Sequence, residues 1–235
     1  MTATVSLLVP TRDRPERCAD MWRSALSTAA EPKNLELVLY LDDDEPRMRD
    51  YLTWMETEDP TQTWMVRGPR ILLSETWNRC ADIAVGEIMW HGNDDVLFRT
   101  EAWDESVRGA FNEFPDRIAC VHGRDGIHNG GSATLGFYSR EWVEALGYFV
   151  PPYFASDYND TWLTEVANEL GRRRFLPEVY TEHMHPVAGK GTWDRTHQER
   201  MTRHAQENVD ALYASLAHER RADAAKLRRA IEESA

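Results

Sequence analysis

Residues 87–98 read Glu87-Ile88-Met89-Trp90-His91-Gly92-Asn93-Asp94-Asp95-Val96-Leu97-Phe98. The apolar run that ends at Trp90 predicts a buried strand, and two adjacent carboxylates, Asp94 and Asp95, follow it before the chain turns apolar again. Carboxylates held together at the end of a core strand repel each other and lose solvation, and a divalent cation removes that cost. Oxygen ligands of this kind suit Mg²⁺ or Mn²⁺. The alternative is a solvated turn, because Asn, Asp and Gly are also common turn residues.

The composition indicates one globular domain, or one domain with an appendage. The chain has 235 residues, of which 42% are hydrophobic, and this supports a substantial core. The net charge is −13, and acidic and basic side chains nearly balance from Arg195 onward, so the acidic excess lies in residues 1–194. Such a surface is a poor general partner for nucleic acid, which needs a basic footprint.

We expect a catalytic domain over residues 1–194 and a helical extension over residues 195–235. Residues 196–234 are polar, contain no Gly or Pro, and carry a thin apolar seam, which predicts one or two long helices. Such an extension packs on its own body or on a second subunit, so a homo-oligomer formed through it is one expectation.

The cysteines and the N-terminus predict a cytoplasmic protein. Cys18, Cys80 and Cys120 are odd in number and widely spaced, without the spacing of a metal or disulfide motif. The N-terminus enters a strand-like run directly, and neither a basic leader nor a long apolar segment is present. We therefore expect no signal peptide and no membrane span.

A first unit of strand, loop and helix begins at Val5. The apolar run Val5 to Val9 predicts a strand buried on both faces, and a proline-bounded loop then breaks it. Ligands bind at the carboxyl ends of strands in open α/β sheets, and Arg in this position suits a phosphate or a base edge. The predicted ligand-binding residues of this loop are Pro10, Thr11, Arg12 and Arg14. The alternative is an exposed polar loop.

A second predicted strand, residues 35–41, ends in a cluster of acidic residues at positions 42–45. We expect at most one of these side chains to bind a ligand, with Asp42 accepting hydrogen bonds from a ribose or a base, because acidic runs are usually solvated loops. Arg67, in the turn after the next apolar patch, is a further predicted nucleotide-binding residue. A helix is predicted from Ser74 through Trp77 to the region of Gly86.

The second half of the chain contributes two more pairs of polar residues. Asp157 and Asp160 follow an aromatic, proline-kinked segment and lie three residues apart, so both can face one side of the entrance to a helix. The alternative role of Asp157, or of Ser156, is to cap that helix. His183 and His185 alternate in an extended segment and therefore point the same way.

The order of these pieces resembles a nucleotide-sugar glycosyltransferase of the GT-A type, in the broad family 2, over about residues 4–187. The loop at residues 10–14 resembles the family's nucleotide loop, and Asp42 matches an Asp that contacts the base or ribose. Trp77-Asn78 followed by Gly-Asn-Asp-Asp at residues 92–95 resembles the family's Asn-containing helix and its metal motif. The resemblance implies an α/β fold, with a Rossmann-like mixed sheet flanked by helices and a C-terminal helical extension.

The same resemblance assigns roles to individual residues. It implies that Asp95 binds the metal, that Asn93 and Asp94 lie at the diphosphate, and that Trp77 and Asn78 also bind the nucleotide sugar. The family usually has an Asp where this chain has Gly92, two positions before Asp94, and this departure leaves open whether Asp94 or Asp95 contacts the metal. Residues 156–160 resemble the acidic segment that supplies the catalytic base, with Ser156 in place of a Glu. The remaining assignments are Asp157 as base with Asp160 in reserve, and His183 or His185 as a further metal ligand.

These assignments predict an enzyme that moves a sugar from a nucleotide-diphosphate sugar, with a UDP-sugar favoured, to an acceptor hydroxyl. We expect Mn²⁺ or Mg²⁺ as cofactor and inversion at the anomeric carbon. The acceptor is left open among a glycan, a protein side chain, a small molecule and a modified DNA base. Two alternatives are a nucleotidyltransferase, which needs a similar site, and a non-catalytic nucleotide- or sugar-binding module, which the departures at Gly92 and Ser156 would favour.

Overall fold

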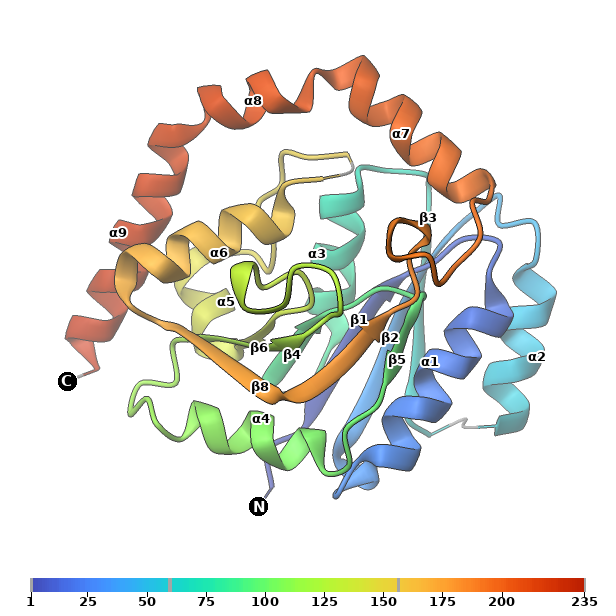
Figure 1. Ribbon diagram of the computed structural model, residues 1–235, viewed down its shortest axis with the longest axis horizontal. Coiled ribbons are helices and arrows are strands. Elements are labelled where there is room, and N and C mark those ends of the chain that lie inside the picture. Colours follow the sequence, from blue (N-terminus) through green and yellow to red (C-terminus); the bar gives the residue numbers. More distant parts are fainter. Residues whose placement is uncertain (1, 59–60, 156, 235) are drawn as a thin grey trace.

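The computed structural model describes residues 2–58, 61–155 and 157–234. Within these residues, eight strands form one twisted sheet with helices on both faces (Figure 1). The strand order is β3-β2-β1-β4-β7-β6-β8-β5. The strands are β1 (Val5–Pro10), β2 (Leu35–Asp42), β3 (Thr63–Gly68), β4 (Ile88–His91), β5 (Val96–Phe98), β6 (Cys120–Arg124), β7 (Phe137–Ser139) and β8 (Arg173–His183).

The helices fall between the strands and after the last of them. They are α1 (Pro15–Thr28), α2 (Met48–Glu58), α3 (Leu73–Ile83), α4 (Trp103–Phe111), α5 (Arg140–Leu146), α6 (Asn159–Leu170), α7 (Arg195–Glu207), α8 (Val209–Ser215) and α9 (Ala217–Glu233). Short 3₁₀ helices occur at Pro32–Asn34, Asn129–Gly131 and Pro186–Ala188. This mixed α/β architecture with a helical C-terminal part is the fold class that the sequence predicted.

The parallel half of the sheet brings several strand ends to one edge. β1 pairs in parallel with β2 and β4, and β2 pairs in parallel with β3, so the carboxyl ends of all four strands meet. β7 runs antiparallel to β4 and makes the sheet mixed. The edge where parallel strands end is where α/β sheets bind ligands, so the topology places a site there before any side chain is considered.

A hydrophobic core lies on each face of the sheet. Successive side chains of a strand point to opposite faces, and Leu7 and Leu8 of β1 belong to different cores. Helices α1, α2 and α4 cover the face of Leu7, with Trp22 fully buried there. Helices α3, α5, α6 and α9 cover the face of Leu8. Burial on both faces explains why β1 and β2 are almost continuously apolar, as the sequence predicted for them.

The C-terminal part forms an arc of helices over the sheet (Figure 1). The described residues contain three helices here instead of the expected one or two, because the chain breaks at Asn208, which has φ 46°, and again at Leu216. The apolar seam of α9 is buried against the body through Ala224 and Leu227. In α7, by contrast, His197 is the one residue that is buried.

The start of α6 differs from the sequence prediction. Helix α6 begins at Asn159 after Tyr158, which has φ 73° and provides no side-chain cap, so capping by Asp157 is wrong. Ser156, the other predicted cap, lies outside the described residues. A search of the described helices for one long and apolar enough to cross a bilayer finds none.

Candidate active site

A cavity of about 410 Å³ opens at the edge where the parallel strands end. Its size is typical of a small-molecule site. Most of the residues that the sequence predicted for the site line it: Pro10, Thr11, Arg12, Arg14, Asp42, Trp77, Asn93, Asp94, Asp95, Asp157, Asp160, His183 and His185. They come from the ends of β1, β2, β4 and β8, from α3 and from the start of α6, elements far apart in the sequence.

Two predicted site residues lie elsewhere. Arg67 is exposed and pairs with Asp43 at 3.2 Å. Asn78 braces the proline-kinked segment, since its Oδ1 accepts hydrogen bonds from the backbone N–H groups of Phe149 and Val150 at 2.9 Å. The structure therefore does not bring Arg67 or Asn78 into the cavity.

Strand register explains why the loop after β1 meets the acidic motif. Leu8 of β1 is level with His91 of β4, so the residues three positions further along each chain, Thr11 and Asp94, become neighbours. Thr11 Oγ1 donates a hydrogen bond to Asp94 Oδ2 at 2.8 Å, and Arg14 Nη1 donates to Asp94 Oδ1 at 3.0 Å. Asp94 is only 5% exposed, so the solvated-turn alternative is wrong for this residue.

The register of β1 and β2 likewise brings Arg12 beside Asp42. Pro10 is level with Tyr40 in the parallel pairing of β1 and β2, and Arg12 Nη1 contacts Asp42 Oδ2 at 2.9 Å. Asp42 is buried, whereas the neighbouring Asp44 is exposed. Burial raises the pKa of Asp42 against the opposing effect of Arg12. Of the acidic run, Asp42 thus lines the cavity.

Asp95 faces imidazoles instead of the arginines. Val96 pairs with His183 in the antiparallel register of β5 and β8, and this places Asp95 beside His183. His183 Nε2 lies 3.2 Å from Asp95 Oδ1, and His197 Nε2 lies 3.9 Å from Asp95 Oδ2. The ring centroid of His185 lies 5.3 Å from that of His183 and 5.0 Å from that of His197.

The two adjacent carboxylates titrate differently. Burial raises the pKa of Asp94, and Arg14 offsets this only in part. Burial opposes ionisation of Asp95 as well, but the neighbouring imidazoles of His183 and His197 hold the pKa of Asp95 well below its usual range. The pKa of His185 is lowered to about 4, first by burial and then by the charge of His183. Asp95 is therefore the more firmly ionised of the pair.

The donor atoms of these residues are of types that bind divalent cations. A carboxylate with imidazoles is a donor set that Mn²⁺ accepts, and His183 Nδ1 is buried without a partner. Across residues 2–58, 61–155 and 157–234, no group of three or more Asp, Glu, His or Cys side chains is arranged to hold an ion. In the present arrangement the imidazoles of His183 and His197 lie beside the Asp95 carboxylate, and the ring of His185 lies against both.

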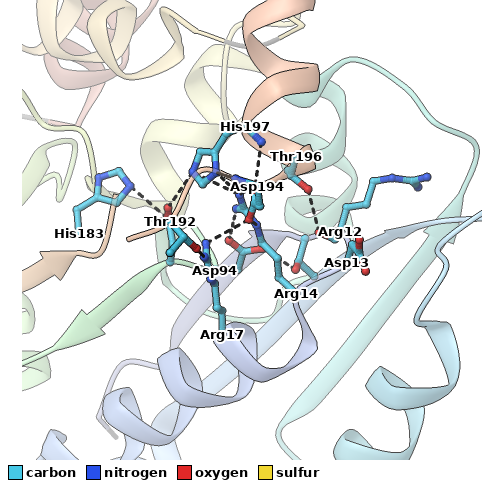
Figure 2. Close-up of polar contacts among 12 residues, drawn as sticks. Arg12, Asp13, Arg14, Arg17, Asp94, His183, Thr192, Asp194, Thr196 and His197 are labelled. Carbon is cyan, nitrogen blue, oxygen red and sulfur yellow. Dashed lines mark hydrogen bonds and ion pairs between the residues drawn. The ribbon is translucent and has the colours of Figure 1, made fainter. Parts of the chain in front are cut away.

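Helix α7 supplies a wall of the cavity that the sequence did not predict. The side chain of Arg14 reaches α7, with Nε donating to Asp194 Oδ2 at 2.8 Å and Nη2 donating to Asp194 Oδ1 at 2.7 Å (Figure 2). Asp194 also caps α7 by accepting a hydrogen bond from the backbone N–H of His197. Four residues of α7 line the cavity: Thr196, His197, Arg200 and Arg203.

The sequence contains one pattern that could have predicted this part of the site. His197, Arg200 and His204 are spaced by three and four positions, so a helix places them on one face. The acidic partner of that face is not visible in the sequence, because Asp157 lies more than forty residues away. Arg70 is a further cavity residue that was not predicted, and it pairs with Glu199 of α7.

The two candidate bases have different partners. Asp157 pairs with Arg200 through one carboxylate oxygen and accepts from His204 Nδ1 at 2.6 Å through the other. Within the described part of the chain, Asp160 accepts hydrogen bonds from its neighbour Thr161, from the backbone N–H at 2.7 Å and from Oγ1 at 3.4 Å. Burial raises the pKa of Asp160. Asp157 is therefore engaged with α7, whereas Asp160 keeps acceptor capacity toward the cavity.

The comparisons with known proteins agree with this architecture. No protein-family model and no curated protein matches the chain. Residues 1–349 of Staphylococcus aureus TarS superpose with a TM-score of 0.57 at 13% identity, covering 76% of this chain and 60% of that one. The same TarS fragment in complex with UDP-GlcNAc gives a TM-score of 0.56 at 15% identity, covering 77% of this chain and 60% of that one.

A third solved structure covers nearly the whole chain. The mannosyltransferase PcManGT from Pyrobaculum calidifontis, in complex with GDP-Man and Mn²⁺, gives a TM-score of 0.60 at 17% identity, covering 98% of this chain and 74% of that one. This chain spans about three fifths of the length of the TarS fragment. Likeness at such identities shows the fold, and the fold is the GT-A-like glycosyltransferase fold that the resemblance implied.

Proposed function

We propose that this chain is a glycosyltransferase that moves a sugar from a nucleotide-diphosphate sugar to an acceptor hydroxyl. The observation that carries the proposal is the buried pair Asp94 and Asp95, held at the end of β4 against the loop after β1, on a fold shared with a mannosyltransferase. PcManGT was solved with GDP-Man and Mn²⁺, and TarS with UDP-GlcNAc. A UDP-sugar remains the first donor to test, with a GDP-sugar second.

The cationic side chains of the cavity support a ligand that carries phosphate. Five arginines line the cavity: Arg12, Arg14, Arg70, Arg200 and Arg203. Arg203 has no hydrogen-bond or ion-pair partner among the described residues, and burial, together with the charge of Arg70, lowers its pKa. A guanidinium without a counterion suits phosphate oxygens, which accept two parallel hydrogen bonds from it.

The proposed enzyme uses a divalent cation as cofactor. Asp95 and His183, with His185 beside them, are the residues that would hold Mn²⁺ or Mg²⁺. When bound, such an ion supplies positive charge that stabilises a diphosphate leaving group.

The contacts favour Asp160 as the base, although the family resemblance ranked Asp157 first. Arg200 and His204 occupy both oxygens of Asp157, which makes Asp157 an anchor for α7. Asp160 has the raised pKa that a general base needs, and among the residues that the structure describes it has no cationic hydrogen-bond partner. In this mechanism Asp160 accepts the proton of the acceptor hydroxyl. At the same time, the oxygen of that hydroxyl bonds to the anomeric carbon. The bond from that carbon to the diphosphate breaks on the opposite face, which inverts the configuration.

The test combines binding with product analysis. We expect one nucleotide among UDP, GDP, CDP, TDP and ADP to raise the unfolding temperature, and Mn²⁺ to increase the shift. A ligand at a hundredfold excess over its Kd adds about 2.7 kcal/mol of stability. The variant Arg203→Ala should bind that nucleotide more weakly, and Arg67→Ala, which removes an arginine outside the cavity, should bind it as the wild type does.

Product analysis separates the alternatives. Release of a nucleoside diphosphate from a sugar nucleotide supports sugar transfer, and release of pyrophosphate indicates a nucleotidyltransferase instead. Binding without any turnover indicates a non-catalytic module. An absence of binding to all five nucleotides, with and without Mn²⁺, would contradict the proposed donor class. The acceptor remains open among a glycan, a protein side chain, a small molecule and a modified DNA base.

A further inference from the structure

The inner part of the cavity contains a group of uncharged polar side chains. His91, Thr134 and Asn159 all line the cavity, and each has a buried polar atom without a hydrogen-bond partner. The atoms are both ring nitrogens of His91, Oγ1 of Thr134 and Nδ2 of Asn159. A buried polar atom that stays unpaired costs about 1–3 kcal/mol, so a ligand that pairs these atoms gains affinity.

The three residues are neighbours at the ends of different elements. His91 is the last residue of β4, and its ring lies 4.1 Å from that of Trp77. The backbone of Thr134 lies beside the His91 imidazole, and the Thr134 side chain lies beside the Asp160 carboxylate. Asn159 begins α6 and directly precedes Asp160. The group therefore lies next to the side chain that we propose as the base.

The hydrogen-bonding capacity of this group matches hydroxyl groups. Burial lowers the pKa of His91 to about 3, so its imidazole is neutral and offers one donor and one acceptor. Asn159 Oδ1 already accepts a hydrogen bond from Ser74 Oγ at 2.8 Å, which fixes the amide and leaves its N–H groups as donors. A hydroxyl both donates and accepts, and it carries no charge that would require a counterion.

The group also differs in charge from the arginines of the cavity. None of the three residues carries a charge, whereas the arginines of the cavity come from the loop after β1, from the segment before α3 and from α7. A nucleotide sugar has the same division, because its diphosphate is anionic and its transferred sugar is a neutral polyol. A sugar seated beside Asp160 would have its anomeric carbon near the proposed base.

We propose that His91, together with Thr134 and Asn159, binds hydroxyl groups of the transferred sugar and thereby determines which sugar the protein accepts. This inference rests on the proposed function, since it names the residues that select the sugar of the donor. A site built to hydrogen-bond a hydroxyl discriminates strongly against analogues that lack it, because its own polar atoms then remain unpaired.

The test measures what the sugar adds to binding. Calorimetry gives the Kd of UDP and UDP-GlcNAc, and of GDP and GDP-Man, for the wild type and for His91→Leu. We expect His91→Leu to weaken binding of the nucleotide sugar about tenfold or more while the affinity for the bare nucleotide is unchanged. The matched control is His122→Leu. His122 is also buried with a pKa lowered to about 4 by burial, but it does not line the cavity, so both affinities should be retained.

Thr134→Val provides a second variant, in case His91→Leu does not fold. It removes one hydroxyl at nearly constant volume, and we expect a several-fold loss of affinity for the nucleotide sugar alone. The inference is overturned, and the proposed function stands, if the wild type transfers sugar while both variants bind the nucleotide sugar as tightly as it does. It is overturned as well if the sugar adds nothing to wild-type affinity. If the wild type binds none of the four compounds, the proposed function fails and the inference fails with it.

Discussion

The cavity has two walls, one made by the sheet edge and one made by α7, and different forces hold them. Thr11 and Asp94 follow β1 and β4, strands that are buried on both faces. In α7, only His197 among its thirteen residues is buried. That helix is joined to the rest of the site by polar contacts, which link Asp194 to Arg14, Glu199 to Arg70 and Arg200 to Asp157.

This difference predicts different stability for the two walls. Burial of apolar surface contributes about 25 cal/mol per Å², and it holds the strands on both faces. Exposed ion pairs contribute roughly 0–1 kcal/mol each, so the contacts of Arg70 and Arg200 hold α7 only weakly. Regions with few buried apolar contacts open first under native conditions. We therefore expect α7 to open before the sheet edge does.

The largest expected effect comes from the base. Asp160→Asn keeps the shape of the side chain and removes its ability to accept a proton, so sugar transfer should fall by roughly 10²–10⁴-fold. Nucleotide affinity should stay close to that of the wild type. Asp157→Asn, which weakens the contacts of Asp157 with Arg200 and His204, should reduce transfer much less and should loosen α7. Steady-state rates and nucleotide affinities of the two variants give the comparison.

The pH dependence distinguishes the two carboxylates. The pKa of Asp160 is raised by burial, so the wild-type rate should fall tenfold per pH unit once the pH drops below that pKa. The residual rate of the Asp160→Asn variant should not decrease in this way when the pH is lowered. If Asp157→Asn instead removes the pH dependence and most of the activity, Asp157 is the base, as the family resemblance alone would assign.

The next effect concerns Arg14, which contacts Asp94 at the sheet edge and Asp194 at the start of α7. Arg14→Leu leaves Asp94 buried without its cation, and breaking a buried ion pair in this way costs about 3–5 kcal/mol of stability. Chemical denaturation measures the change. The control is Arg23→Leu, which removes an exposed pair with Glu58 and should cost less than 1 kcal/mol. Equal losses in the two variants would show that the buried ion pair of Arg14 contributes no more than an exposed one.

The smallest effect concerns the start of α7. Asp194→Ala removes the helix cap and the contact with Arg14, and loss of a cap alone costs about 1 kcal/mol. Hydrogen exchange should become faster in residues 195–207, with the strands unchanged. Asp194→Ser keeps a capping hydroxyl without the ion pair, so it should lie between Asp194→Ala and the wild type. Exchange that rises equally in β1 and α7 would contradict the separation of the walls.

The comparison of walls also explains which site residues the sequence predicted. The sheet-edge residues follow apolar runs, and equal offsets in parallel strands bring them together, as with Thr11 and Asp94. Arg203 is on a helix whose sequence is mostly polar, and no local pattern predicts that this helix packs against the edge of the sheet. Asn78 is part of a family-like motif, but its contacts are with the backbone of Phe149 and Val150.

By itself, the sequence determined the α/β class, the buried strands and the strand ends where polar residues gather. Those features depend on local hydrophobic patterns. A strand that is apolar on both faces must lie in a part of the sheet that other elements cover on both sides. Only the tertiary structure decided that α7 lies over the cavity, that Arg200 pairs with Asp157, and that Asp160 stays free of cationic hydrogen-bond partners. The physical reason is that these contacts join segments distant in the chain through specific polar geometry, which hydrophobic periodicity does not encode.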